Sequence, residues 1–276
     1  MFALQPGRLF TVSVAMDQFV TRIAIMDVAN KLVSPEVKIE LPLTHNDKAL
    51  SILTHNISSA IERSGIDREK IIGVGIGMPG FIDVTKGVNY SFLPTNGKSL
   101  TNLIEEEVGL PVFIDNDSSL VALAELRFGA AKGKNNVMVI NIGWGIGLGM
   151  IVNGSLFRGY NGFAGEFSHI PLFLNNKLCG CGKSGCLETE ASMQVVLAKA
   201  KEGIAAGRVC ALKEIPDDYD EACSMVINAA VNGDQFAMEL ISETAYNIGR
   251  GIAILIHILN PELVVLSGRG AQAGKM

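Results

Sequence analysis

The sequence has few aromatic residues, few charges and no long uninterrupted apolar segment. Aromatic residues make up 6% of the 276 residues and charged residues 18%, while 48% are hydrophobic. Charged or polar residues interrupt every apolar run before it reaches the length of a transmembrane helix, which excludes a spanning segment. The opening residues, MFALQPGRLF, lack the basic and apolar regions of a secretory signal. We therefore expect a cytoplasmic protein with no membrane partner.

Positive charge is also scarce, and cysteine is too rare for a disulfide framework. The formal net charge is -5, so the chain has no electrostatic attraction for the phosphate backbone of nucleic acid. Of the five cysteines, three lie close together, which fits a reducing compartment better than a set of disulfides. The length and the apolar content are sufficient for two domains, each with its own hydrophobic core.

The spacing of apolar residues predicts alternating strands and helices. We expect strands within 10–27, 71–83, 111–117, 137–152 and 260–270, and helices at 48–64, 99–108, 118–128, from about 188, at 219–231 and at 234–259. Asp117 is expected to cap the helix that stops at Gly129. Gly249 and Gly251, inside the last helix, are expected to allow close packing against a neighbour. This alternation is typical of a mixed α/β sheet with ligands at the carboxyl ends of strands.

The second half of the chain begins in the same way as the first. Segments 10–27 and 137–152 each read as a strand, a turn and a second strand, which suggests a duplicated fold with a cleft between its halves. We place an N-terminal α/β domain at 1–117 and a C-terminal α/β domain at 118–276. The chain stops at Met276, where a helix is expected to begin, so we expect a truncated C-terminus.

The clustered cysteines predict a metal site. Cys179, Cys181 and Cys186 lie in the sequence CGCGKSGCLE, whose glycines let the backbone turn tightly enough to direct several sulfurs at one centre. Structural zinc takes four nitrogen or sulfur ligands in a tetrahedron, and His169 is the natural fourth. The alternative is three reduced cysteines in a surface loop.

Four further polar residues indicate a ligand with many hydroxyl groups. Asn116 and Asp117 lie at the end of a predicted strand, and Glu166 lies three residues before His169. Glu188 lies two residues after Cys186, the last cysteine of the cluster. Carboxylates, an amide and a metal-held imidazole supply the donors and acceptors that a sugar ring needs. Each residue also has a simpler interpretation. Asn116 and Asp117 can form an ordinary turn and cap, and the two glutamates can be solvated surface charges.

These motifs together resemble the ROK family, named for repressors, open reading frames and kinases. The resemblance covers nearly the whole chain and rests on CGCGKSGCLE, GEFSH, DNDSSLVALAE, GVGIGMPGFID and GWGIGLG. It implies an actin-like, sugar-kinase fold of two ribonuclease-H-like domains around a cleft. By this resemblance the zinc ligands are His169, Cys179, Cys181 and Cys186. The corresponding sugar-binding set is Gly80, Asn116, Asp117, Glu166, His169 and Glu188, with Asp117 as catalytic base if the chain is a kinase.

The sequence departs from the kinases of that family where ATP would bind. Their first hairpin carries an Asp-x-Gly-Gly-Thr turn, and the matching residues here are Ala15, Met16, Asp17, Gln18 and Phe19. Their second turn reads Gly-Thr-Gly, and here it reads Gly143-Trp144-Gly145. Ser119 replaces an asparagine of the sugar site. We therefore expect a bound structural zinc, and neither ATP nor magnesium.

The sequence keeps the residues that match the sugar site and lacks those that match the ATP site, and in this it resembles the repressor members of the family. The leading hypothesis is the sugar-sensing effector domain of a transcriptional regulator, a homodimer or homotetramer. DNA would be bound only through an N-terminal helix-turn-helix that this chain does not show. The alternative is an ATP-dependent sugar kinase, similar to glucokinases or N-acetylhexosamine kinases, that uses Asp117 as base. A purely structural interaction module would not need so many convergent sugar contacts.

Overall fold

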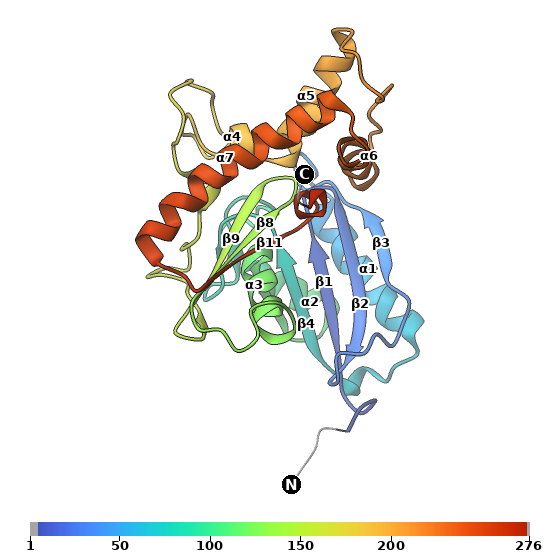
Figure 1. Ribbon diagram of the computed structural model, residues 1–276. Helices are drawn as coiled ribbons and strands as arrows, with labels where there is room; N and C mark the ends of the chain where they lie inside the picture. Colours follow the sequence, from blue (N-terminus) through green and yellow to red (C-terminus); the bar gives the residue numbers. More distant parts are fainter. Residues whose placement is uncertain (1–4, 275–276) are drawn as a thin grey trace. The chain divides into compact units, whose positions relative to one another are not determined.

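The computed structural model describes residues 5–274 (Figure 1), and the described chain divides into two compact units. The first contains the residues up to Leu120 together with the short segment Gly159–Phe163, and the second contains Val121–Arg158 and the chain from Ala164 onward. Within the described residues, no helix is both long enough and apolar enough to cross a lipid bilayer.

The first unit is built on a mixed sheet. Its strands lie in the order β3 (Val37–Glu40), β2 (Val20–Asp27), β1 (Phe10–Met16), β4 (Ile71–Met78) and β7 (Val112–Asn116). β1, β2 and β3 pair antiparallel, whereas β4 and β7 run parallel to β1. Side chains on β1 alternate, so that Val12, Val14 and Met16 are buried. They share one core with the apolar residues of helices α1 (Ala49–Ser64) and α2 (Leu100–Val108).

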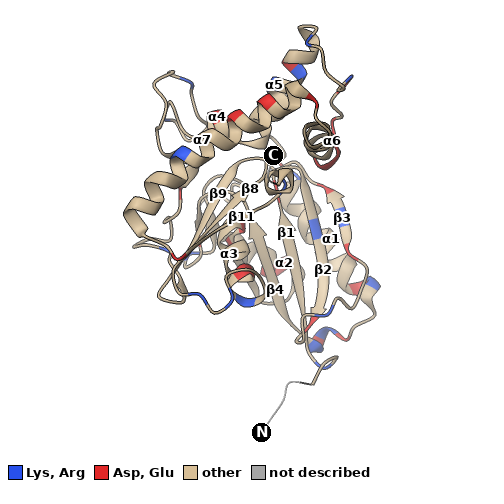
Figure 2. Cartoon of the chain, in the orientation of Figure 1, with Lys and Arg blue, Asp and Glu red and all other residues tan. Residues whose placement is uncertain are grey.

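The sheet of the second unit repeats this order. Its strands are β10 (Ser155–Leu156), β9 (Ile146–Val152), β8 (Val137–Ile142) and β11 (Leu263–Ser267). β8, β9 and β10 pair antiparallel and β11 runs parallel to β8, as β4 does to β1. The duplication predicted from the two hairpins is therefore confirmed. Figure 2 shows that charged residues lie mostly on helices and loops, and the sequences of β8, β9 and β11 contain none.

Three of the helices that follow the cysteine segment begin at side-chain caps. The helices there are α4 (Glu188–Ala191), which has no side-chain cap, α5 (Met193–Ala205), α6 (Tyr219–Val231) and α7 (Gln235–Leu259). The side chains of Ser192, Asp218 and Asp234 each accept a backbone N–H at the start of α5, α6 and α7. The helix predicted from about residue 188 does begin at Glu188, but it ends at Ala191, because Ser192 adopts an extended backbone that separates α4 from α5.

The prediction that Asp117 caps the helix ending before Gly129 is wrong. α3 (Asp117–Phe128) already includes Asp117, and the Asn116 side chain caps the helix by accepting the backbone N–H groups of Ser118 and Ser119, at 3.0 and 3.1 Å. The shorter elements are η1 (Arg68–Lys70), η2 (Phe167–His169), η3 (Gly270–Ala273) and the hairpin of β5 (Ile82–Asp83) with β6 (Val88–Asn89).

The two glycines inside α7 have different surroundings. A Cβ built on Gly251 would lie 2.8 Å from ring atoms of Phe167 and 3.0 Å from Leu187, whereas one on Gly249 would meet no atom within 4 Å. The predicted close packing is thus confirmed at Gly251 and wrong at Gly249. Phe167 and Leu187 are both buried, so the close approach at Gly251 joins α7 to the segment between them.

We predict opposite effects of adding a methyl group at these two positions. Gly251→Ala should lower the free energy of unfolding by about 1–3 kcal/mol, because the core must move to accept it. Gly249→Ala should raise it by about 0.5–1 kcal/mol through a better helix propensity. Urea unfolding of the two variants measures both values. Equal stabilities would show that Gly251 is not tightly packed against Phe167.

Candidate metal centre and polar site

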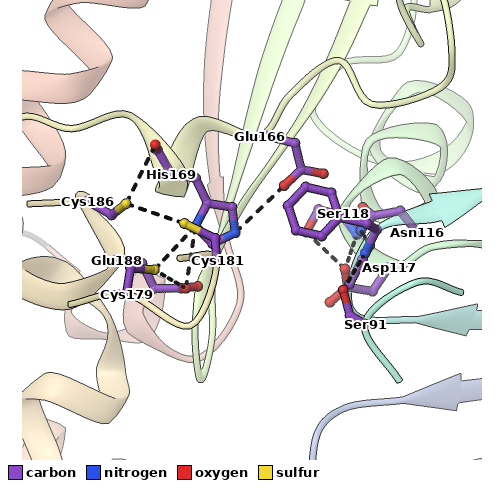
Figure 3. A network of polar contacts seen from close by, with 12 residues as sticks. Ser91, Asn116, Asp117, Ser118, Glu166, His169, Cys179, Cys181, Cys186 and Glu188 are labelled. Carbon is purple, nitrogen blue, oxygen red and sulfur yellow. Dashed lines mark hydrogen bonds and ion pairs between the residues drawn. The ribbon is translucent and has the colours of Figure 1, made fainter. Parts of the chain in front are cut away.

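Four side chains of the second unit converge on one point. The ligand atoms of His169, Cys179, Cys181 and Cys186 all lie within 4.8 Å of one another, as Figure 3 shows. His169 Nδ1 is 3.6 Å from Cys179 Sγ, and the sulfurs of Cys181 and Cys186 are 3.7 Å apart. The sequence prediction that these four residues come together is therefore confirmed.

The spacing fits a tetrahedral zinc ion. With Zn–S bonds of about 2.3 Å and a Zn–N bond of about 2.0–2.1 Å, two sulfurs in a tetrahedron lie about 3.8 Å apart and a sulfur and a nitrogen about 3.5 Å apart. The distances measured between unbonded partners, 3.7 and 3.6 Å, are close to these values. The sulfurs are also too far apart for a disulfide, and all five cysteines are free thiols. The residues thus fit a structural zinc.

Backbone hydrogen bonds fold the cysteine segment into a compact knuckle. The N–H of Cys179 donates to Lys183 O at 2.8 Å, and the N–H of Gly182 donates to Cys179 O at 2.9 Å. Gly182 has φ +85°, a left-handed conformation that favours glycine. The N–H of Leu187 donates to Ile170 O at 3.0 Å, which ties the end of the knuckle to the residue after His169.

The protonation of the ligands is consistent with a bound cation. Burial lowers the pKa of His169, with a further contribution from Lys183, and this keeps the imidazole in the neutral form that binds metals. Without a cation, burial raises the pKa of the Cys186 thiol to about 12. Holding Cys186 as the thiolate that zinc requires therefore needs a positive charge at the centre.

We predict one zinc per chain, lost when a ligand is removed. Cys181→Ser should lower the zinc content below one equivalent and reduce the melting temperature, because metal binding contributes folding free energy. Cys210→Ser is the matched control, since Cys210 lies outside the centre and its thiol donates to Leu212 O at 3.2 Å. Elemental analysis and calorimetry of both proteins give the result. A zinc-free wild-type chain of unchanged stability would contradict the assignment.

In the first unit, the predicted residues Gly80, Asn116 and Asp117 lie together. Asn116 Nδ2 donates to Gly80 O at 3.3 Å, while its Oδ1 caps α3. Gly80 has φ +99°, and a Cβ there would lie 2.6 Å from Ser91 Cβ, so the position requires glycine. The simple interpretation of Asn116 as a cap is therefore correct as well, because the same side chain holds the Gly80 loop and starts the helix.

The carboxyl group of Asp117 is in surroundings that disfavour its charged form, because it is removed from solvent. Its Oδ1 accepts the N–H of Ser118 at 2.7 Å and the Ser118 hydroxyl at 3.2 Å. Burial raises the pKa of Asp117 to about 6, the hydrogen bonds from Ser118 oppose the rise, and the nearby charge of Asp17 adds to it. A carboxyl group with a pKa near neutrality can accept a proton from a hydroxyl or hydrogen-bond one.

In the second unit, the predicted residues Glu166 and Glu188 flank His169. Glu166 Oε2 is 3.9 Å from His169 Nε2, and Glu188 Oε2 is 3.9 Å from His169 Nδ1. Burial raises the pKa of Glu188, opposed by a hydrogen bond from the Ile146 N–H. A Cβ on Gly145 would overlap Glu188 Oε1. Both glutamates thus lie beside the His169 ring and are partly exposed.

Sequence reasoning missed the residue that shapes the Gly80 loop. Asn89 is buried, its Nδ2 donates to Pro79 O at 2.9 Å, and its Oδ1 accepts the N–H groups of Ser91 and Phe92. Ser91 Oγ in turn accepts the N–H of Phe81 at 3.0 Å. An asparagine followed two residues later by serine is a weak turn signal, and nothing in the sequence links it to Pro79.

The turn between β1 and β2 is closed by its own side chain. Asp17 Oδ1 accepts the backbone N–H groups of Phe19 and Val20, both at 2.7 Å, and the N–H of Asp17 donates to Val20 O at 2.9 Å. The carboxylate therefore occupies the position of an anion bound to a turn. The sequence showed an acidic residue in this turn, but it did not predict that Asp17 would use the amide donors itself.

The carboxyl ends of β8 and β11 are also occupied by side chains. Trp144, in the turn after β8, packs edge-on against Tyr219 at a centroid distance of 5.4 Å. Arg269, directly after β11 and Gly268, binds Asp220 through Nε at 3.0 Å and Nη2 at 2.9 Å. These pairs join residues far apart in the sequence, and only Trp144 had been identified as unusual.

Comparison with known proteins identifies the family. The ROK family model matches residues 13–276, and the chain belongs to this family. It is 35% identical over 264 residues to a glucokinase of Halalkalibacterium halodurans, covering 92% of this chain and 78% of that protein. It is 29% identical over 276 residues to a xylose repressor of Caldicellulosiruptor bescii, covering 96% of this chain and 65% of the repressor.

Solved structures of both kinds share the fold. A ROK family transcriptional regulator, a homologue of the E. coli MLC protein, matches 97% of this chain and 67% of its own, with a TM-score of 0.80 and 29% identity. A ROK glucokinase from Streptomyces griseus, in complex with glucose and AMPPNP, matches 94% of this chain and 83% of its own, with a TM-score of 0.77 and 28% identity. The predicted actin-like, sugar-kinase-like fold is confirmed, and relatives of this chain include both regulators and kinases.

Proposed function

We propose that the chain is the sugar-sensing body of a ROK-type transcriptional regulator and transfers no phosphoryl groups at a useful rate. The observation that carries the proposal is the closed turn at Asp17. Backbone N–H groups in such a turn can bind a phosphate, but here the Asp17 carboxylate takes those of Phe19 and Val20. A nucleotide phosphate would have to displace this carboxylate and would meet its negative charge.

The second turn supports the same conclusion. Ligands of α/β sheets bind at the carboxyl ends of strands, and at β8 and β11 those ends are filled by the Trp144–Tyr219 pair and the Arg269–Asp220 ion pair. The resemblance places the second phosphate-binding turn at Gly143-Trp144-Gly145. The bulky indole replaces a threonine hydroxyl there, and its ring is already engaged by Tyr219.

The sugar-binding groups of both units are retained. Asn116 and Asp117 offer an amide and a carboxyl group in the first unit, and Glu166, His169 and Glu188 offer acceptors and a donor in the second. Zinc would hold His169 through Nδ1, so that Nε2, which faces Glu166, hydrogen-bonds a sugar hydroxyl. The metal fixes the ring orientation and takes no other part.

A regulator of this kind would act as an oligomer. DNA binding would fall to a helix-turn-helix module outside these 276 residues, and two DNA half-sites would require a homodimer or homotetramer. The alternative is a sugar kinase. The Asp117 carboxyl group, with a pKa of about 6, suits a general base, and the 35% identity to a glucokinase favours the same hypothesis.

We expect a sugar to raise the melting temperature, because a ligand that binds only the native state stabilises it by mass action. The panel is D-glucose, D-xylose and N-acetyl-D-glucosamine. Glu166→Ala should abolish the shift while zinc stays bound, and Glu106→Ala, which removes an exposed carboxylate on α2, should leave it unchanged. A wild-type chain that none of these sugars stabilises would contradict sugar sensing.

A kinase assay on the same protein distinguishes the regulator from the kinase hypothesis. ADP release is measured with magnesium-ATP and the sugar that gives the largest thermal shift. The regulator proposal predicts no release above the background of Asp117→Asn. Turnover on the order of one per second, within the usual range for kinases, that disappears in Asp117→Asn would establish the kinase alternative.

A further inference from the structure

Phe163 lies where the chain passes from the first unit back to the second. Phe163 belongs to the segment Gly159–Phe163, which packs with the first unit although the chain on both sides of it belongs to the second. Its ring lies edge-on to Phe81 and to Tyr90, each at a centroid distance of 6.1 Å and at interplanar angles of 77° and 69°. We refer to Phe81, Tyr90 and Phe163 as the aromatic clip.

Two members of the clip are part of the loop that carries Gly80. Phe81 follows Gly80 directly, and its N–H donates to Ser91 Oγ at 3.0 Å. The N–H of Tyr90 donates to Phe81 O at 2.8 Å. Since Asn116 Nδ2 donates to Gly80 O, the two rings are fixed to the same hydrogen-bonded network as the predicted sugar ligands of the first unit.

The third member is the last residue before the chain returns to the second unit. A Cβ on Gly165 would lie 2.5 Å from Leu148 O on β9, so Gly165 already packs against the second sheet. Ala164 also packs against the core of the second unit, so the chain crosses between Phe163 and Ala164. Glu166 lies three residues after Phe163, so its Cα stays within about 10 Å of the Phe163 Cα whatever arrangement the two units adopt.

We propose that Phe163 is a positioning residue for the sugar site and that the aromatic clip keeps Glu166 within reach of a sugar held by Asn116 and Asp117. Gly162 at φ +91° and Gly165 at φ +99° have no side chains, so the Phe163 ring supplies the side-chain contacts that anchor this segment to the first unit. This inference rests on the proposed sugar binding. It adds a residue that touches no sugar but determines how strongly one binds.

Isothermal titration with D-glucose, D-xylose and N-acetyl-D-glucosamine tests the clip. Phe163→Ala should weaken binding of the sugar that the wild type binds best by about tenfold, because two edge-to-face ring contacts are lost. Tyr160→Ala is the matched control, since Tyr160 lies in the same segment but is fully exposed, and it should bind as the wild type does. Phe163→Tyr keeps the ring and should restore binding. All three variants should retain one zinc.

The outcomes distinguish this inference from the function on which it rests. If the wild type binds none of the three sugars, the proposed function fails. If it binds one and Phe163→Ala binds it equally well, the clip alone is contradicted. If Phe163→Ala does not fold, Tyr90→Leu removes one of the two ring contacts at a half-exposed position and should weaken binding by about threefold. Unchanged affinity in Tyr90→Leu would then overturn the inference.

Discussion

The convergence of one imidazole nitrogen and three sulfurs is the constraint on which the polar site of the second unit depends. The segment from Glu166 to Glu188 contains no regular helix or strand longer than the turn η2, and Leu174 and Leu178 are exposed rather than packed. Ile170, Leu172 and Phe173 pack against the core, but no long helix or strand pairing holds the segment in place. A tetrahedral ion would fix both of its ends, because His169 lies near the first and Cys186 near the second.

The same segment is attached to the core immediately outside the metal ligands. Phe167 precedes His169 by two residues, Leu187 follows Cys186, and both are buried against Gly251 on α7. The metal centre is therefore linked to the longest helix among the described elements through two side chains that only a glycine can accommodate. Glu166 precedes Phe167 and Glu188 follows Leu187, so these two buried side chains determine where the glutamates lie.

The sequence allowed the metal ligands and the duplicated hairpins to be predicted, because each depends on local spacing. It placed the cap of α3 at Asp117 rather than at Asn116, since both side-chain types accept backbone N–H groups about equally well. It did not reveal the break at Ser192, because apolar periodicity continues through it. The Trp144–Tyr219 pair and the contact of Phe163 with Phe81 join residues about 75 to 82 positions apart along the chain, and no local pattern encodes such pairs.

The account requires zinc to act as a structural ion that is already saturated by the protein. X-ray absorption at the zinc edge measures this directly, before and after a sugar is added. The account predicts three sulfur neighbours at about 2.3 Å and one nitrogen at about 2.0–2.1 Å, unchanged by the sugar. An oxygen ligand from water or sugar in the first coordination shell, or a loss of sulfur neighbours when the sugar binds, would contradict it.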